Sequence, residues 1–126
     1  MAKQIISTVN APIPKGPYSQ GVRVGDLLFV SAQGPFDPKT GKVSGNDIES
    51  QTRQTLQNIK TIVEASGFSL NDIVRVTVFL RYSSDFQKMN EVYSTIFSES
   101  APARTTVEAS VPMPDVLIAA DAIAGH

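Results

Sequence analysis

Two kinds of apolar spacing alternate along this chain, and their order restricts the fold more than any other feature. Apolar residues recur every third or fourth position in residues 46–67 and again in 84–97, as in helices that bury one face. Between these segments, residues 74–80 carry Val or Leu at every second position, which is the spacing of a strand. The chain is therefore predicted to form a helix, a strand and a second helix, in this order.

Both predicted helices carry capping patterns. Asn46 with Glu49, and Ser84 with Gln87, have the spacing of a capping box, in which two side chains satisfy free backbone amides at the helix start. Gly67 is expected to end the first helix, because glycine adopts the left-handed conformation at a helix C-terminus without steric cost.

Short strands are predicted on both sides of this helical region, at residues 4–8, 20–24, 27–32, 104–110 and 116–124. Gly25 and Asp26 are placed to form a hairpin turn between the second and third strands. Residues 27–30 read Leu-Leu-Phe-Val, and a segment that is apolar at every position is expected to be buried on both faces.

The predicted order is three strands, a helix, a strand, a helix and two strands, which favours an α+β fold with both helices on one face of a mixed sheet. Phe79, Leu117 and Ile123 have the parity of the other face, so an isolated protomer would expose a broad apolar patch. We therefore expect a homo-oligomer with closed symmetry that buries this patch.

The length of 126 residues fits one domain, residues 1–126. No apolar run approaches the roughly 20 residues of a membrane span, and the first residues lack the apolar core of a signal peptide, so a cytoplasmic protein without membrane contact is expected. Eleven Lys and Arg balance twelve Asp and Glu in a scattered pattern, which argues against a nucleic-acid partner.

Metal sites and thiol chemistry are not predicted. The chain has no cysteine, so it offers neither a disulfide nor a thiolate ligand. Its single histidine, His126, has no carboxylates at the spacing of metal ligands.

Arg104, at the start of a predicted strand, is the first candidate for a binding site. Strand parity places it on one face with Thr106 and Glu108. Its guanidinium is a planar fork that suits a carboxylate held by two parallel hydrogen bonds. The alternative, which spacing alone favours, is an ion pair with Glu108 or with a neighbouring chain.

Other polar residues are weaker candidates. Tyr18 could close over a small ligand with its ring and hydroxyl, or pack its loop onto the core. Ser31 and Ala32 end an apolar strand, where backbone donors could hold an anion or a water, and a plain turn is equally compatible. Asn90 could equally be a solvated position on the second helix.

Seven short motifs, taken together, resemble the Rid family, which is also called the YjgF or RutC family. They are, in order, Gly16-Pro17-Tyr18-Ser19-Gln20, Ser31-Ala32-Gln33-Gly34-Pro35, Asp37-Pro38-Lys39-Thr40-Gly41, Gln51-Thr52-Arg53-Gln54, Asn58-Ile59-Lys60, Met89-Asn90-Glu91-Val92-Tyr93 and Pro102-Ala103-Arg104. The set covers nearly the whole chain, although no single motif would suffice. The resemblance implies a chorismate-mutase-like fold and a homotrimer with three ligand clefts between subunits.

RidA-type members of this family hydrolyse reactive 2-imino acids or their enamines, such as 2-iminobutanoate and 2-iminopropanoate, to 2-oxo acids and ammonia without a cofactor. A protonated imine is already electrophilic, so positioning and one activated water suffice for this chemistry. The resemblance implies that Arg104 is the catalytic residue that clamps the carboxylate. It implies further substrate contacts from Tyr18, Ser31, Ala32, Asn90 and Thr106.

The chain departs from the family pattern in its last strand. RidA-type deaminases carry Glu-x-Glu-Ala-x-Ala there, and the first Glu handles the water or its proton, whereas this chain has Ala119. Asp121 lies about 6 to 7 Å further along the same strand face and is the alternative acid. The usual Gly after Ser31 is Ala32, and the usual Cys is Thr106.

Four functions therefore stand beside one another. The first is an imine deaminase, and the second is a non-catalytic binding protein for 2-oxo or short fatty acids, which Ala119 favours. The third is a nuclease or translation inhibitor, against which the formal net charge of -1 argues. The fourth is a chaperone-like surface role, which no sequence pattern supports or excludes.

Overall fold

The computed structural model describes residues 2–126, and Met1, the first residue of the predicted domain, lies outside the described residues. The elements are β1 (Gln4–Ile6), β2 (Gly21–Val24), β3 (Leu27–Gln33), α1 (Ile48–Ala65), β4 (Ile73–Leu80), α2 (Phe86–Ile96), β5 (Ala103–Glu108) and β6 (Ile118–Gly125), with short 3₁₀ turns at Leu70–Asp72 and Ser83–Asp85. Within the described chain, no helix combines the length and the apolar character needed to span a membrane.

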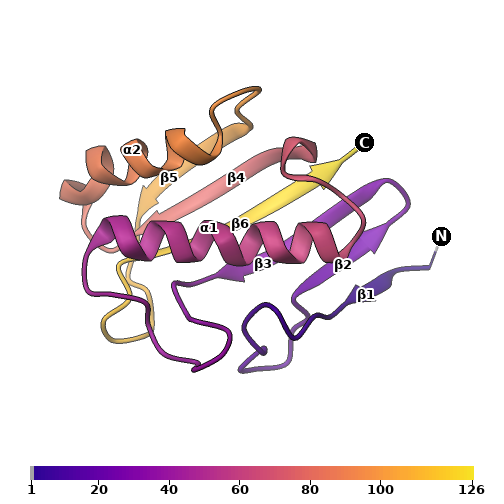
Figure 1. Ribbon diagram of the computed structural model, residues 1–126, viewed down its shortest axis with the longest axis horizontal. Helices are drawn as coiled ribbons and strands as arrows, with labels where there is room; N and C mark the ends of the chain where they lie inside the picture. The colour runs from indigo at the N-terminus through magenta and orange to yellow at the C-terminus, as the bar shows by residue number, and fades with distance from the viewer. Residues whose placement is uncertain (1) are drawn as a thin grey trace.

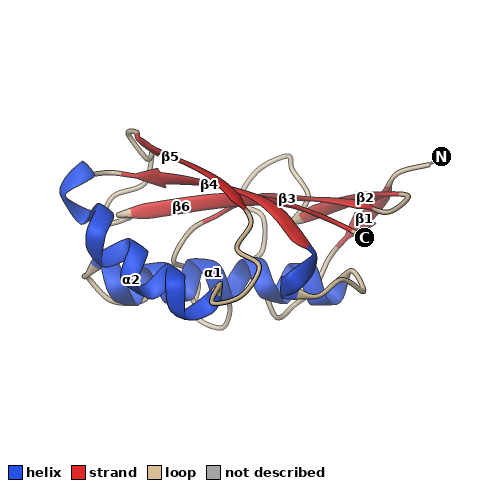
Figure 2. Ribbon diagram, turned by 90° about the horizontal axis from the view of Figure 1, so that it is seen from above, coloured by secondary structure: helices blue, strands red, loops and turns tan. Residues whose placement is uncertain are grey.

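The six strands form one mixed sheet in the order β1-β2-β3-β6-β4-β5. All neighbouring strands are antiparallel except β4 and β5, which are parallel because α2 connects them as a crossover. Both helices lie on the same face of the sheet, as Figure 1 shows from the front and Figure 2 shows edge-on. The predicted α+β fold, with two helices on one face of a mixed sheet, is confirmed.

The core lies between α1 and the centre of the sheet. α1 buries Leu56, Ile59 and Val63, which recur at helical spacing along its inner face. β6 lies beneath this helix and presents small side chains from Ala120, Ala122 and Ala124, with every second residue buried. Alanines at the middle of the sheet leave room for the larger side chains of the helix, so both layers pack closely.

The other side of the sheet, which we call the open face, has no covering layer in the protomer (Figure 2). Large apolar residues lie on it, with exposed fractions of 47% for Leu27, 45% for Phe29 and 39% for Val107. Phe79 and Ile123 are half-buried there, as their parity predicted. Leu117, which the same parity placed on this face, precedes β6 and packs against the core instead. The prediction that residues 27–30 are buried on both faces is therefore wrong for the protomer, because both helices cover the face that holds Leu28 and Val30.

The helix starts differ from the predicted capping boxes. Asp47, not Asn46, caps α1: its carboxylate accepts the backbone N–H of Ser50 at 2.7 Å. This bond lowers the pKa of Asp47. α2 begins after a 3₁₀ turn and has no side-chain cap, so the predicted box of Ser84 and Gln87 is not formed.

Gly67 was predicted to end the first helix. Gly67 follows the last turn of α1 with φ of 84°, and it ends the helix as predicted.

Val74 was predicted on the apolar face of β4, but it is 51% exposed. Its neighbour Ile73 is buried instead, because the pairing with β6 shifts between Ile73 and Arg75.

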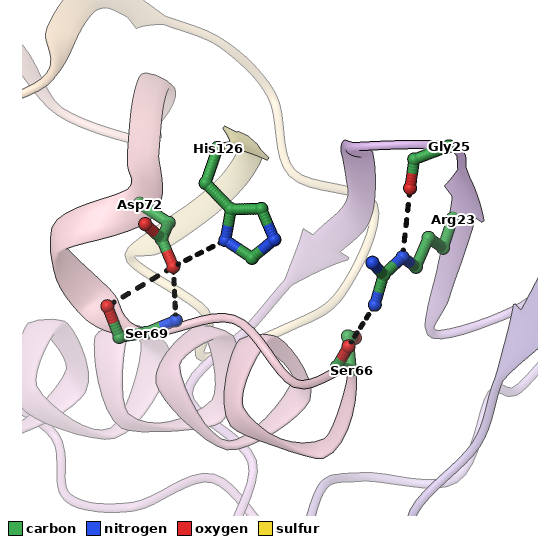
Figure 3. A network of polar contacts seen from close by, with 6 residues as sticks. All are labelled: Arg23, Gly25, Ser66, Ser69, Asp72 and His126. Carbon is green, nitrogen blue, oxygen red and sulfur yellow. Dashed lines mark hydrogen bonds and ion pairs between the residues drawn. The ribbon is translucent and has the colours of Figure 1, made fainter.

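Contacts at one end of the sheet join β2, the end of α1 and the end of β6 (Figure 3). The His126 ring stacks on Phe68 with centroids 4.3 Å apart, and its Nδ1 lies 3.4 Å from a carboxylate oxygen of Asp72. Arg23 lies over the same Phe68 ring at 4.7 Å and donates to the carbonyl of Ser66. The connection between α1 and β4 is thus held from two sides.

Candidate functional site

Arg104 faces α2, not solvent. β5 directs the side chains of Arg104 and Thr106 to the helix-covered face, in register with the buried Val76 and Val78. The guanidinium carbon of Arg104 lies 4.7 Å from the centroid of the Tyr93 ring and 5.7 Å from that of Phe86. The positive charge is therefore held between a strand and two aromatic rings of one helix face, in cation–π geometry.

No carboxylate of the described residues pairs with Arg104. Among residues 2–126 it forms no ion pair, and Glu108 instead accepts the backbone N–H of Ser83 at 2.6 Å. An intramolecular Arg104–Glu108 ion pair, the alternative that spacing favoured, is therefore excluded within the protomer. The guanidinium keeps its hydrogen-bonding capacity for an external anion.

Three polar atoms of α2 and β5, the two elements that hold this arginine, have no hydrogen-bond partner within residues 2–126. Asn90 lies on the same face of α2 as Phe86 and Tyr93, because residues three and four positions apart share a helix face. Asn90 Oδ1, the Tyr93 hydroxyl and Thr106 Oγ1 are buried and have no hydrogen-bond partner within residues 2–126. Burial raises the pKa of Tyr93, and the Arg104 charge partly opposes this shift, so the phenol stays protonated at neutral pH.

Three further predicted site residues line a different part of the molecule, a cavity of about 440 Å³. Tyr18, Ser31 and Ala32 contribute to its wall, whereas Asn90, Arg104 and Thr106 do not. The remaining wall is mainly apolar and comes from the Pro-rich loop after β1, the end of β3 and the loop before β6. Its lining residues are Pro12, Ile13, Lys15, Gln20, Gln33, Gly34, Phe36, Val111, Pro112, Met113, Val116 and Ala119.

Ser31 and Ala32 reach the cavity through an irregularity in β3. The pairing of β3 with β6 shifts between Val30 and Gln33, so the two residues leave the regular ladder. The Ser31 hydroxyl donates to the carbonyl of Ser19 at 2.6 Å, which ties the strand end to the preceding loop. Ser31 therefore has a structural role that its place in the sequence did not indicate.

Tyr18 is half-exposed at the cavity and folds back on its own loop. Its hydroxyl accepts the backbone N–H of Lys15 at 3.2 Å. The Lys15 ammonium lies 4.1 Å from the centroid of the Phe36 ring, across the cavity wall. Lys15 and Phe36 were not singled out from the sequence, since a lysine in a Pro-rich loop carries no pattern that predicts a ligand wall.

Ala119 and Asp121 occupy different environments on β6. Ala119 lines the cavity, but Asp121 does not, and it lies on the open face in register with Thr77 of β4. Arg104 lies on the opposite, helix-covered face of the sheet. Asp121 and Arg104 are therefore not brought together within one protomer.

The two groups of predicted site residues are also separated across the sheet. β3 carries Ser31 and β5 carries Arg104, and β6 and β4 lie between them. Three strand spacings correspond to about 14 Å, which is longer than a small 2-oxo or 2-imino acid. In the protomer they are two partial sites: an arginine group of Asn90, Arg104 and Thr106, and a cavity group around Tyr18, Ser31 and Ala32.

The described residues 2–126 contain no group of three or more His, Asp or Glu side chains arranged to hold a metal ion. The fold and the two partial sites thus define an α+β protein with an unpaired, aromatic-flanked arginine and a separate apolar cavity.

Comparison with known proteins gives the family. The chain matches the family model described as Endoribonuclease L-PSP over residues 8–125. A RutC family protein of Pyrococcus horikoshii is 56% identical over 122 residues, which are 97% of each chain. The 2-iminobutanoate/2-iminopropanoate deaminase of Escherichia coli is 45% identical over 122 residues, which are 94% of each chain.

A solved structure agrees with this result. The crystal structure of Escherichia coli TdcF with bound serine has a TM-score of 0.92 and 40% identity, and the match covers 98% of each chain. The chain belongs to the Rid family, which includes the YjgF and RutC proteins, and it has the YjgF fold.

Proposed function

We propose that this protein hydrolyses 2-imino acids, such as 2-iminobutanoate and 2-iminopropanoate, to 2-oxo acids and ammonia. The observation that carries the proposal is the free guanidinium of Arg104, which is half-buried, stacked on Tyr93 and not neutralised by a carboxylate of the described chain. Two similar proteins support a small carboxylate ligand: one is named as a deaminase of such imines, and one has a structure with bound serine.

The proposed chemistry needs few protein groups. Arg104 donates two parallel hydrogen bonds to the substrate carboxylate, and the Asn90 side-chain oxygen accepts an N–H of the protonated imine. A water oxygen adds to the carbon of the protonated imine, and one proton moves from that oxygen to nitrogen, which gives a tetrahedral intermediate with a hydroxyl and an –NH3+ group. The C–N bond then breaks, ammonia leaves, and the hydroxyl releases its proton to solvent as the C=O of the 2-oxo acid forms. Orientation of an electrophile that already reacts with water supplies much of the rate.

We further propose that the site is completed between subunits of a homotrimer. The arginine group and the cavity group lie too far apart to grip one small molecule in a single protomer, and the open face exposes Leu27, Phe29 and Val107. Association through the open face would bury this apolar surface. Because β5 is an edge strand of the sheet, we propose that the same assembly brings the arginine group of one subunit to the cavity group of its neighbour.

A binding protein for small carboxylates is the second candidate. It is favoured by one observation: the cavity wall contains no Asp or Glu, and Ala119 occupies the position of the family's water-handling glutamate. Such a protein would use the same arginine and the same cavity, and it would not accelerate hydrolysis.

The test couples a pyridoxal-phosphate threonine dehydratase to this protein and follows the appearance of 2-oxobutanoate, with free imine trapped by semicarbazide. We compare the wild type with Arg104→Ala and with Arg53→Ala, which removes an exposed arginine on the outer face of α1. A deaminase speeds 2-oxobutanoate formation and lowers the trapped adduct, and only Arg104→Ala abolishes both effects.

No acceleration over buffer, across imines derived from several amino acids, would contradict the deaminase proposal. Calorimetric titration with 2-oxobutanoate then tests the binding protein. Binding that disappears in Arg104→Ala and persists in Arg53→Ala would establish this second candidate.

A further inference from the structure

Arg81 lies at the end of β4 and directs its guanidinium into the loop that forms one wall of the cavity. Its Nε donates to the carbonyl of Val116 at 2.7 Å. Its Nη2 donates to the carbonyls of Val111 at 2.8 Å and Met113 at 2.7 Å. The backbone N–H of Arg81 donates to the carbonyl of Leu117 at 3.0 Å, so one residue holds four carbonyls of this loop.

The loop has no regular structure of its own to fix this shape. It lies between β5 and β6 and contains Asp115 in the left-handed conformation, with φ of 66°, which is uncommon for a residue other than glycine. Gln51 of α1 also holds this loop, since its side-chain amide donates to the Asp115 carbonyl at 2.8 Å. Side chains outside the loop therefore maintain its conformation.

The guanidinium of Arg81 holds the loop and does not pair with a carboxylate of the described residues. Within residues 2–126 it forms no ion pair, and its side-chain hydrogen bonds all go to loop carbonyls. The planar fork of a guanidinium satisfies several carbonyls at fixed angles, whereas a lysine ammonium is a point charge on a flexible stem. The number and geometry of these bonds need an arginine.

Three residues held in this way face the cavity: Val111, Met113 and Val116. Together with Ile13 and Phe36 they form an apolar part of the cavity wall. The substrate's carboxylate and imine are the same in every 2-imino acid, so contacts with this surface distinguish one side chain from another.

We propose that Arg81 is a positioning residue that sets the shape of this wall and thereby determines which substrate side chains the cavity accepts. This inference rests on the proposed function for the identity of the ligand, but not for the conformation of the loop. A side chain as large as that of leucine has far more apolar surface to place against this wall than a methyl group has. Greater mobility of the loop therefore weakens the binding of substrates with large side chains more than the binding of small ones.

The experiment compares Arg81→Lys and Arg81→Gln with the matched variants Arg53→Lys and Arg53→Gln. An L-amino-acid oxidase generates the imines of alanine and leucine, and kcat and KM are measured for each by competition with semicarbazide. We expect the Arg81 variants to lose about tenfold in kcat/KM for the leucine imine, mainly through KM, with less than a twofold change for the alanine imine. The Arg53 variants should match the wild type.

Hydrogen exchange gives a readout that does not depend on turnover. Amides of residues 111–117 should exchange at least tenfold faster in the Arg81 variants, while those of α1 and β4 keep their wild-type rates. Equal loss for both imines, or unchanged exchange in the loop, would overturn the proposal, because a purely structural role lowers all activities together.

The two proposals fail in different ways. If the wild type hydrolyses neither imine, calorimetric titration with pyruvate and 4-methyl-2-oxopentanoate replaces the kinetic measurement. Weaker binding of the larger acid alone in the Arg81 variants then supports the role of Arg81. If neither acid binds the wild type, the proposed function and the specificity role of Arg81 are both overturned. Faster loop exchange would then still show that Arg81 holds the loop.

Discussion

The guanidinium carbon of Arg104 lies 4.7 Å from the centroid of the Tyr93 ring, so β5 and α2 hold one positive charge between them. The ring restricts the arginine without consuming its hydrogen-bond donors, because cation–π attraction acts through the ring face. A salt bridge would have fixed the side chain equally well but would have neutralised it. The arrangement thus presents a preordered and unneutralised cation to a ligand.

This relationship predicts different effects for two substitutions of Tyr93. Tyr93→Phe keeps the ring and removes a hydroxyl that has no hydrogen-bond partner within residues 2–126, so the Kd for 2-oxobutanoate should change less than twofold. Tyr93→Leu removes the ring and should raise that Kd about tenfold, in line with a cation–π contribution of about 1 to 2 kcal/mol. Calorimetric titration measures both. Equal weakening in the two variants would assign the effect to the hydroxyl instead.

The second prediction concerns the missing acid. Ala119 lines the cavity and is half-buried, so Ala119→Glu places a carboxyl group at the cavity wall without disturbing the core. A positioned general acid or base contributes about 10²- to 10⁴-fold, and turnover of 2-iminobutanoate should rise at least tenfold. Ala119→Gln, which has the same shape and no ionisable group, should not raise it. If Ala119→Glu is no faster than the wild type, the water is activated elsewhere.

The third prediction tests assembly through the open face. Phe29 is 45% exposed there, and Phe29→Glu would bury a charge if subunits cover this surface. We expect light scattering after size exclusion to find trimers for the wild type and monomers for Phe29→Glu. Val9→Glu is the control, since Val9 is 88% exposed in the loop after β1. Trimers of Phe29→Glu would show that the open face is not the interface.

The fourth prediction concerns a buried amide that supports the cavity. Asn58 of α1 is 1% exposed and donates to the carbonyls of Gly34 at 3.0 Å and Phe36 at 2.9 Å. Asn58→Ala leaves both carbonyls without this donor and should lower the free energy of unfolding by about 2 to 4 kcal/mol, measured by urea titration. The exposed neighbour Gln57→Ala should change it by less than about 0.5 kcal/mol. Similar values for both would mean that water replaces the amide.

The fifth prediction concerns pH. The hydrogen bond from Ser50 lowers the pKa of Asp47, so this group stabilises the folded state above its unfolded pKa of about 3.9 and loses the effect as pH falls through the lower, folded value. Asp47→Ala should therefore lower Tm at pH 7, and the difference from the wild type should disappear in strong acid. Asp85→Ala is the control, because Asp85 precedes α2 without a side-chain cap bond. A Tm difference that does not vary with pH would contradict the assignment.

Much of the fold could be predicted from periodicity because each element has one strongly apolar face. The strand and helix order and the two-layer arrangement follow from residues such as Leu56 and Val76, whose positions repeat with the element's own period. The exact cap could not be predicted: Asn46 and Asp47 have similar propensities, and backbone geometry decides which one accepts the helix N–H.

The candidate site was less predictable for a different reason. Motifs indicated Arg104 and Ser31 separately, but nothing in their spacing says that two other strands, β6 and β4, lie between the strands that carry them. The support from Arg81 was missed altogether, since an arginine after a strand has no local partner. The three carbonyls that accept hydrogen bonds from its side chain lie at least 30 residues further along the chain.

The crossover through α2 has a consequence for how this protein can change over evolutionary time. Phe86, Asn90, Tyr93 and Arg104 all belong to one continuous β4-α2-β5 unit, whereas the cavity is assembled from three segments distant in sequence. Substitutions in the loops can alter the cavity while this unit is inherited intact. Over evolutionary time, members of this family can therefore come to accept different ligand side chains while they keep the arginine that binds the carboxylate common to all these ligands.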